Sequence, residues 1–457
     1  MKRETQKTST SFIEDNGEAK RALDEGAMRV IARKEIKRPK FNIDLMEEVL
    51  NRNNLNAAFK RVKRNKGAAG VDGMNVDELK SHIHENFWKI KEALLTGKYQ
   101  ASPVRKVEIP KPNGGVRQLG IPTVVDRFIQ QALAQVLQRG FDPTFSDSSF
   151  GFRPKRSAHG AIAKSKSIQN NGYHFVVDLD LAKFFDEVNH DRLMSRLASV
   201  IKDKRVLKLV RMFLRSGVLD NGLVSTPDKG TPQGGPLSPL LSNIVLDELD
   251  KELEARGHKF VRYADDCNIY VKTERAGIRV MESVTKFIEE KLKLRVNEEK
   301  SSVTEPYKSQ FLGFSFTPAW KGKSRSRIAK KSLKRFKDKI RNFTSCRKRV
   351  KFEVFIKDLR VYLIGWKGYF GKSDCTGIFR DLDMWIRRRV RCFIWQQWRK
   401  IKTRAKKLRK FGVRDELALT TAATRKGAWR LSTSPGLNIA FPKSYFDRIG
   451  LPRLYEM

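Results

Sequence analysis

Hydrophobic residues in the first third of the chain recur at the three- and four-residue spacing of amphipathic helices. One such stretch begins at Leu45 and ends in a glycine-rich loop over residues 65–73. Residues 104–109 and 116–121 are two β-prone runs joined by a Pro- and Gly-rich turn, which predicts a hairpin. A long helix is then predicted by apolar residues on one face: Phe128, Ile129, Ala132, Leu133 and Val136.

Two later segments carry carboxylates on otherwise apolar strands. Asp178 and Asp180 lie in the first, and the period-2 alternation of a strand puts both on one face. Asp265 and Asp266 lie between two β-prone runs, which predicts a hairpin that holds both acids at its turn. Asp is a common turn residue, but adjacent carboxylates repel each other unless a cation offsets their charge. The two strands together therefore favour a shared metal site over two unrelated turns.

After Pro318, helical periodicity is combined with strong positive charge. Residues 321–351 hold fifteen Lys or Arg against one acid, and residues 385–410 hold twelve and no acid. Aromatic side chains are interleaved with the second run: Trp385, Phe393, Trp395 and Trp398. A solvated face over an aromatic core explains the aromatics but not the missing acids. We therefore predict a basic helical domain that follows the backbone of RNA or DNA.

Overall composition supports a nucleic-acid partner. The 457 residues, 40% of them hydrophobic, are enough for two or three folded domains. A formal net charge of +43 destabilises a compact fold by self-repulsion unless a polyanion is present. A membrane partner is not expected, because no apolar run is long enough to span a bilayer. The four cysteines form no Cys-x-x-Cys pair, which is typical of reduced thiols in an intracellular protein.

Several short motifs follow one another along the chain. From the N-terminus, they are residues 109–117, 150–154, 178–180, 231–239, 263–266, 311–314, 365–370 and 424–430. A single Asp-Asp pair is a weak signal, whereas so many motifs in order are specific. Over roughly residues 44–457 the chain resembles a bacterial group II intron-encoded reverse transcriptase/maturase.

The resemblance implies an α+β fold: a right-hand polymerase, with fingers and a palm on a mixed sheet, followed by an α-helical thumb/maturase domain. The implied divisions are a flexible N-terminal extension (1–43), an N-terminal RNA-binding segment with fingers (44–170), the palm (171–318), the thumb/maturase domain (319–405) and a short DNA-binding tail (406–457). Some relatives carry a DNA endonuclease after the maturase region. Its Cys pairs and His/Asn constellation are missing here, so we do not expect target-DNA cleavage.

Nucleotide addition in this family is a phosphoryl transfer in which two metal ions activate the primer 3′-oxygen and stabilise the leaving pyrophosphate. The resemblance assigns Asp265 and Asp266 to one side of a site for two Mg²⁺ ions, for which Mn²⁺ can substitute. Asp178 and Asp180 share a face, so both are candidates for the other side. The family places the catalytic Asp five residues before an aromatic residue, an interval that Asp180 and Phe185 fit. Asp180 is therefore the assigned ligand, and Asp178 a structural neighbour.

The remaining assignments also come from the resemblance. Phe185 resembles a steric gate that excludes a ribose 2′-OH, although a plain core Phe is an alternative. Lys300 matches a possible general acid for pyrophosphate, and a surface lysine is nearly as good an interpretation. The nucleotide-binding candidates are Lys111, Arg117, Phe185, Gln233 and Lys300. The primer-grip candidates are Phe311, Leu312 and Gly313. The RNA-binding candidates are Arg387, Arg388, Arg389, Arg391 and Trp398.

The implied activity is RNA-directed DNA synthesis from dNTPs on an RNA template with a DNA primer. The implied partners also include a group II intron RNA, whose splicing the protein promotes, and the target DNA of intron mobility, in a bacterial cytoplasm. Two alternatives stay open: an RNA-binding maturase without polymerase activity, and a domesticated relative in phage defence or DNA repair. The intact acids and Gln233 favour the active polymerase.

Overall fold

The computed structural model describes residues 41, 43–110, 116–220, 223–225, 229–230, 234–345 and 351–456. Residues 1–40 of the predicted extension and the candidates Lys111 and Gln233 lie outside the described residues. The chain forms two compact units. Unit 1 comprises Met1–Phe145 and Asn189–Ile244, and unit 2 comprises Ser146–Val188 and Val245–Met457. Both units are discontinuous in sequence, and each is described separately below.

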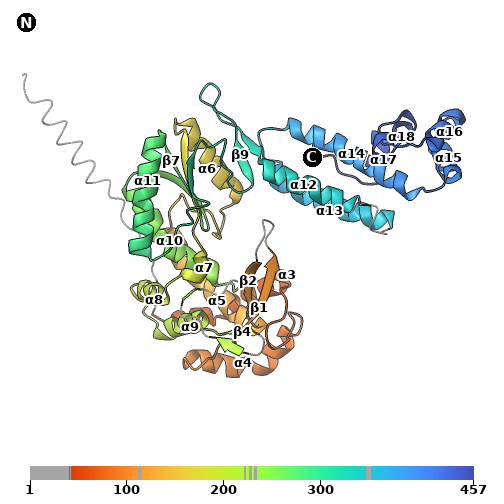
Figure 1. Cartoon of the computed structure of the whole chain (residues 1–457). Coiled ribbons are helices and arrows are strands. Elements are labelled where there is room, and N and C mark those ends of the chain that lie inside the picture. Colours follow the sequence, from red (N-terminus) through yellow and green to blue (C-terminus); the bar gives the residue numbers. More distant parts are fainter. Residues whose placement is uncertain are drawn as a thin grey trace, which may run out of the picture. The chain divides into compact units, whose positions relative to one another are not determined.

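Unit 1 combines helices with a small mixed sheet (Figure 1). Its helices are α2 (Leu45–Val49), α3 (Arg52–Asn65), α4 (Leu79–Leu95), α5 (Val124–Phe141), α8 (His190–Ala198) and α9 (Lys204–Leu214). The strand order is β2 (Val116–Ile121), β1 (Val104–Pro110), β4 (Val218–Asp220) and β5 (Leu223–Ser225). The β1–β2 pair is antiparallel and β1–β4 is parallel, so the predicted hairpin is confirmed within a mixed sheet. The predicted long helix is α5, which is buried on most of its surface.

The first part of unit 2 is a four-stranded antiparallel sheet. Its order is β6 (Lys259–Tyr263), β7 (Asp266–Val271), β3 (Phe175–Leu179) and β8 (Ser302–Thr304). Helix α11 (Glu274–Phe287) packs against β3, β7 and β8, and α6 (Ala158–Asn170) packs against β6. Short α7 (Phe184–Glu187) follows β3, and long α10 (Ser238–Ala255) leads into β6. The sheet therefore brings the two acid-bearing segments of the sequence side by side.

The second part of unit 2 is helical, as the apolar periodicity predicts. It begins with a hairpin of β9 (Phe314–Phe316) and β10 (Ser326–Ile328). The helices are α12 (Lys330–Phe343), α13 (Phe352–Phe370), α14 (Gly377–Gln397), α15 (Ile401–Lys410), α16 (Asp415–Ala423), α17 (Ala428–Leu431), α18 (Pro435–Ala440) and α19 (Lys443–Arg448). One hydrophobic cluster extends from Ile328 to Leu454. Residues after 405, which the sequence sets apart as a tail, therefore share the core of the preceding helices.

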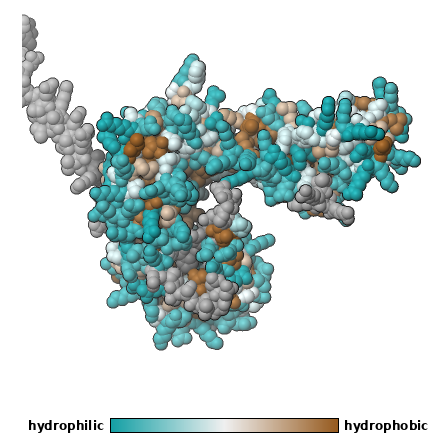
Figure 2. All heavy atoms as spheres, in the orientation of Figure 1, coloured by the Kyte–Doolittle hydropathy of each residue, from teal (hydrophilic) through white to brown (hydrophobic). Residues whose placement is uncertain are grey.

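The surface matches the charged composition. In the space-filling view, hydrophilic residues cover most of the coloured surface, and hydrophobic residues form scattered patches (Figure 2). Among the residues described, no helix is both long and apolar enough to cross a membrane.

The α+β class predicted from the sequence is confirmed.

Candidate active site

The β6–β7 hairpin holds two of the predicted acids, as expected. Tyr263 pairs with Asp266, which leaves Ala264 and Asp265 as a two-residue turn. Ala264 has a φ of 58°, a left-handed backbone conformation that costs free energy for a residue with a side chain. Asp265 therefore lies in the turn itself, and Asp266 is the first residue of β7.

The third acid comes from the neighbouring strand. In the antiparallel β3–β7 ladder, Leu179 pairs with Cys267. Extending this register by one residue sets Asp180 opposite Asp266. Directly opposed residues have Cβ atoms about 4.5–5.5 Å apart in such ladders. The fold thus brings together carboxylates that are 85 residues or more apart in sequence.

The electrostatics show that these acids share one region. Asp266 is exposed by its accessible surface, but the surrounding protein atoms reduce the hydration of its carboxylate and raise its pKa to about 7. The negative charges of Asp265, Asp180 and Asp178 raise this pKa further. Burial raises the pKa of Asp178 to about 6, and a hydrogen bond from Ser309 opposes the shift. Carboxylates that hinder each other's ionisation make a favourable environment for a cation.

Asp180 is held by the segment that follows η2 (Ile288–Leu292). Its backbone carbonyl accepts a 2.9 Å hydrogen bond from the amide of Asn297, and its own amide donates to Ser301 Oγ at 3.1 Å. Lys300 Nζ lies 3.0 Å from Asp180 Oδ2. The lysine side chain is 67% exposed, so it can leave this ion pair at small cost. Lys300 is therefore next to the predicted metal ligand, and its role at the reacting phosphates stays a prediction.

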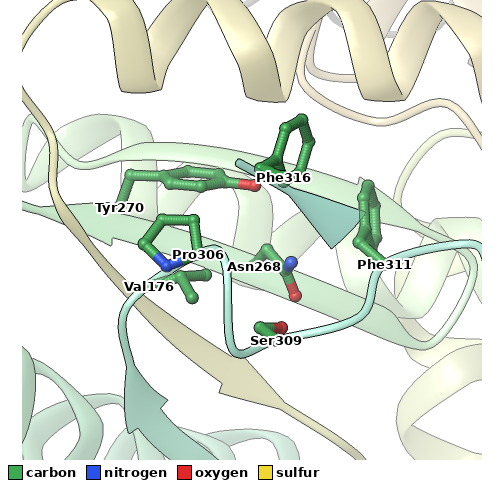
Figure 3. A pocket seen from close by; sticks show the side chains of 7 residues that line it. All are labelled: Val176, Asn268, Tyr270, Pro306, Ser309, Phe311 and Phe316. Carbon is green, nitrogen blue, oxygen red and sulfur yellow. The ribbon is translucent and has the colours of Figure 1, made fainter. Parts of the chain in front are cut away.

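Asp178 has a different environment. Ser309 Oγ donates a 3.2 Å hydrogen bond to Asp178 Oδ2. Ser309, Asn268 and Tyr270 line a narrow gap under the sheet, which has almost no room for a water-sized molecule (Figure 3). The gap is a packing feature and not a substrate site. Asp178 is thus held by a hydrogen bond from Ser309, beside the packed gap. Asp180, by contrast, comes opposite Asp266 when the β3–β7 register is extended by one residue.

The donor set suits a hard divalent cation. Within the described part of the chain, no three His, Cys, Asp or Glu side chains already converge on one point. The side chains of Asp180, Asp265 and Asp266 nevertheless supply the carboxylate oxygens that Mg²⁺ prefers. Their mutual charge repulsion, expressed in the raised pKa of Asp266, is the property that a bound cation would relieve.

A fully buried ion pair, which was not predicted from the sequence, supports the acidic turn. Arg262 and Asp250 both have an exposed fraction of 0%, and their side chains are joined by hydrogen bonds of 2.7 and 2.6 Å. The same guanidinium donates to the carbonyl of Ala264 at 2.8 Å and to Ser149 Oγ at 2.9 Å. Burial disfavours the charge, but Asp250 raises the pKa of Arg262 above its ordinary value. The sequence feature that could have indicated this pair is Arg262 itself, a charged residue within the apolar strand β6.

Gly151 explains why the 150–154 motif needs a glycine. The preceding residue, Phe150, donates its amide to the carbonyl of Arg262 at 2.9 Å, so this segment runs along β6. A Cβ atom on Gly151 would lie 2.3 Å from the backbone nitrogen of Ala264. Only glycine therefore allows the segment to approach the acidic turn this closely.

The nucleotide-side candidates are placed only in part. Phe184 is buried in the core, while its neighbour Phe185 is half-buried, with the two ring centres 5.3 Å apart. Phe184 therefore packs in the core, whereas Phe185 is partly open to solvent. Arg117 lies in β2 opposite Ile109, near the end of its hairpin. The roles of Phe185 and Arg117 stay predictions.

The predicted primer grip is a tight turn. Phe311 and Phe314 exchange two backbone hydrogen bonds of 2.9 Å around Leu312 and Gly313. Both central residues have positive φ, 51° and 80°, which is the type I′ geometry. Tyr369, from α13, donates its hydroxyl to the carbonyl of Leu312 at 2.9 Å. The helical part of unit 2 therefore fixes the turn that follows the acid-bearing sheet.

The RNA-binding candidates make contacts within the helical region. Arg388 lies 3.8 Å from the ring centre of Trp429. Arg389 donates to Thr344 Oγ1 at 2.9 and 2.6 Å, and Arg391 to the carbonyl of Phe441 at 3.1 and 2.8 Å. Trp398 packs among Trp395, Phe411 and Phe441. These contacts give the residues a packing role, and RNA binding by them and by half-buried Arg387 stays a prediction.

The sequence of this chain is similar to those of known protein families. Residues 109–316 match the family described as reverse transcriptase (RNA-dependent DNA polymerase), and residues 333–412 match the group II intron, maturase-specific domain. Protein YkfC of Escherichia coli (strain K12) is 34% identical over 272 residues, covering 51% of this chain and 71% of the relative. Group II intron-encoded protein LtrA of Lactococcus lactis subsp. cremoris is 31% identical over 361 residues, covering 63% of this chain and 60% of the relative. A solved partial Cas6-RT-Cas1--Cas2 complex matches 54% of this chain and 42% of its own, with 26% identity and a TM-score of 0.35.

Proposed function

This chain belongs to the group II intron-encoded reverse transcriptases and maturases, and from that premise we propose that it copies RNA into DNA and assists splicing of a group II intron. The observation that carries the polymerase half is the β3–β7 register, whose extension by one residue sets Asp180 opposite Asp266, beside the turn residue Asp265. Carboxylates supplied by two neighbouring strands are the ligand set that two-metal nucleotidyl transfer uses.

We assign Asp180, Asp265 and Asp266 as the residues that hold two Mg²⁺ ions, with Mn²⁺ as a possible substitute. When bound, the ions supply Lewis-acid activation of the primer 3′-hydroxyl and stabilisation of the pyrophosphate. The chain's own part is to keep the acids in place. Arg262 holds the carbonyl of the turn, and Asn297 holds the backbone of Asp180.

The substrates in this proposal are dNTPs and a DNA primer on an RNA template. Phe185 excludes a ribose 2′-hydroxyl, while Lys111, Arg117 and Gln233 contact the incoming nucleotide. Lys300, 3.0 Å from Asp180, protonates or neutralises the leaving pyrophosphate. The turn formed by residues 311–314 lies against the primer end.

The splicing half rests on the maturase-specific domain and on charge. Intron RNA and target DNA are the proposed partners of the basic helices, in a bacterial cytoplasm. Net charge of +43 supports a polyanionic partner, since such an excess is otherwise unfavourable in a compact fold.

Primer extension tests the polymerase half. Purified protein should extend oligo(dT) on poly(rA) in Mg²⁺, and Asp265→Asn should lower the rate about 10²-fold or more because a metal ligand is lost. Asp381→Asn, an exposed acid on α14, is the matched control and should keep the wild-type rate. Wild-type extension no faster than that of Asp265→Asn, with intact binding of intron RNA, would instead support a maturase without polymerase activity.

A further inference from the structure

The β9–β10 hairpin ends in a rigid turn that the proposed polymerase site does not use. Trp320 and Lys323 exchange backbone hydrogen bonds of 3.1 and 3.0 Å. The two residues between them, Lys321 and Gly322, have φ values of 49° and 73°, which again is the type I′ geometry. The turn therefore fixes Trp320 at the tip of the hairpin.

The base of this hairpin is also anchored. The amide of Thr317 donates to the carbonyl of Arg325 at 2.9 Å, and the amide of Arg325 donates back to Thr317 Oγ1 at 3.0 Å. Ser324 donates its amide to Asn170 Oδ1, at the end of α6, at 2.8 Å. The hairpin near β9 thus projects as an ordered element and not as a loose loop (Figure 1).

Trp320 is 79% exposed, the highest fraction among the large hydrophobic residues that the structure describes. An indole ring in water forgoes the free energy of burial, so a rigid element that presents one is a candidate contact surface. Its flat faces are suited to stacking on another aromatic ring.

The charge around the tip indicates what kind of partner fits. Lys321, Lys323 and Arg325 are exposed and follow the tryptophan at positions one, three and five in the sequence. The stretch from residue 306 to residue 337 contains no Asp or Glu. An exposed aromatic ring among cations matches a nucleotide, which offers a base to stack on and a phosphate to neutralise. Bases in a duplex are already stacked on their neighbours, so an unpaired nucleotide fits best.

We propose that this tip, formed by Trp320, Lys321, Lys323 and Arg325, binds an unpaired nucleotide of bound nucleic acid. The indole stacks on the base, and the three cations contact the flanking phosphates. The site is separate from the acidic turn and rests on the proposed function only in taking nucleic acid as its partner. It is an auxiliary contact that strengthens binding without taking part in nucleotide addition.

Equilibrium binding tests the stacking contact. The probes are a labelled single-stranded RNA of mixed sequence, the same sequence as DNA, and the RNA duplex. Trp320→Ala should weaken binding of the single-stranded probe about 5- to 150-fold, the range of one base–aromatic stack. Trp320→Phe should restore most of the affinity, and Ile278→Ala, which removes an exposed apolar side chain of α11, should change nothing. Because Trp320 is exposed, all variants should keep the wild-type Tm.

The outcomes separate the site from the proposed function. Unchanged binding by Trp320→Ala, or equal losses on single strand and duplex, overturns the stacking contact while leaving the polymerase proposal intact. Failure of the wild type to bind any probe instead overturns the proposed function. Equal losses on RNA and DNA assign the site to unpaired nucleotides of either kind, and a loss on RNA alone assigns it to RNA. A triple Ala variant of the three cations should reduce the salt dependence of binding, by about 0.7 in log–log slope per lost phosphate contact.

Discussion

Replacing Gly151 with Ala should slow catalysis by displacing the acidic turn. The added Cβ would lie 2.3 Å from the nitrogen of Ala264 and 3.0 Å from its Cα, both backbone atoms that cannot rotate away. Ordinary contact begins near 3.4 Å, so the segment and the turn must separate by about 1 Å. A misplacement of about 1 Å at a reacting centre costs about 10²-fold in rate. Because Asp265 and Asp266 follow Ala264 directly, we expect a loss of this size.

Single-turnover primer extension at saturating dNTP measures that loss, and thermal unfolding measures the accompanying strain. Overpacking of this kind typically destabilises a protein by about 1–3 kcal/mol, which leaves a folded protein to assay. Affinity for the template–primer should stay near the wild-type value, since the change is confined to the turn. Gly365→Ala in α13 is the matched control, because a Cβ there meets nothing within 4 Å. A Gly151→Ala protein with both wild-type rate and wild-type Tm would refute the close-approach reasoning.

Three further predictions follow from other contacts. Asp250→Asn should lower the free energy of unfolding in urea by about 3–5 kcal/mol, because it leaves the charge of Arg262 buried and unpaired. The control Glu252→Gln removes an acid that is paired with Arg256 nearer the surface, and it should cost about 1 kcal/mol or less. Equal losses in the two variants would contradict the role of the buried pair. Phe185→Ala should raise the incorporation of ribonucleotides relative to dNTPs, with little change in Tm. Phe184→Ala should instead lower the free energy of unfolding by about 3–5 kcal/mol, because it deletes a core side chain. An unchanged preference for dNTPs in Phe185→Ala would show that Phe185 is not the gate. Burial raises the pKa of Asp383 above its value in the unfolded chain, so its contribution to stability is full at low pH and is lost as the pH rises through the folded-state pKa. The free energy of unfolding of the wild type relative to Asp383→Asn should therefore fall as the pH rises above the ordinary Asp value of 3.8, and a rise would be the wrong sign.

The local parts of the fold were predictable because their signals are local. The alternation around residues 104–121 and the apolar periodicity of α5, α12 and α13 each describe one element without reference to the rest of the chain. The two discontinuous units were not predictable in this way. Unit 1 takes in Asn189–Ile244 through contacts such as the pairing of β1 with β4, which join residues more than 100 positions apart.

The acidic site, too, was predictable from the sequence only in its local part. The hairpin around Asp265 could be predicted from the two runs that flank it. The choice between Asp178 and Asp180 depended on a family interval, and only the pairing of β3 with β7 supplies a geometric reason for Asp180. Gly151 and the Arg262–Asp250 pair have no periodic signal at all. Their importance arises from atoms that approach one another only after the chain has folded.

The hydrophobic cluster that runs from Ile328 to Leu454 has a practical consequence for anyone dividing this protein into fragments. A fragment that stops near residue 405 would lose Leu408, Phe441 and Leu454 from that cluster, each of them fully buried. Their apolar partners on the earlier helices would then face water and promote aggregation. Work on the isolated C-terminal helices therefore requires a clone that extends through the last helical turns.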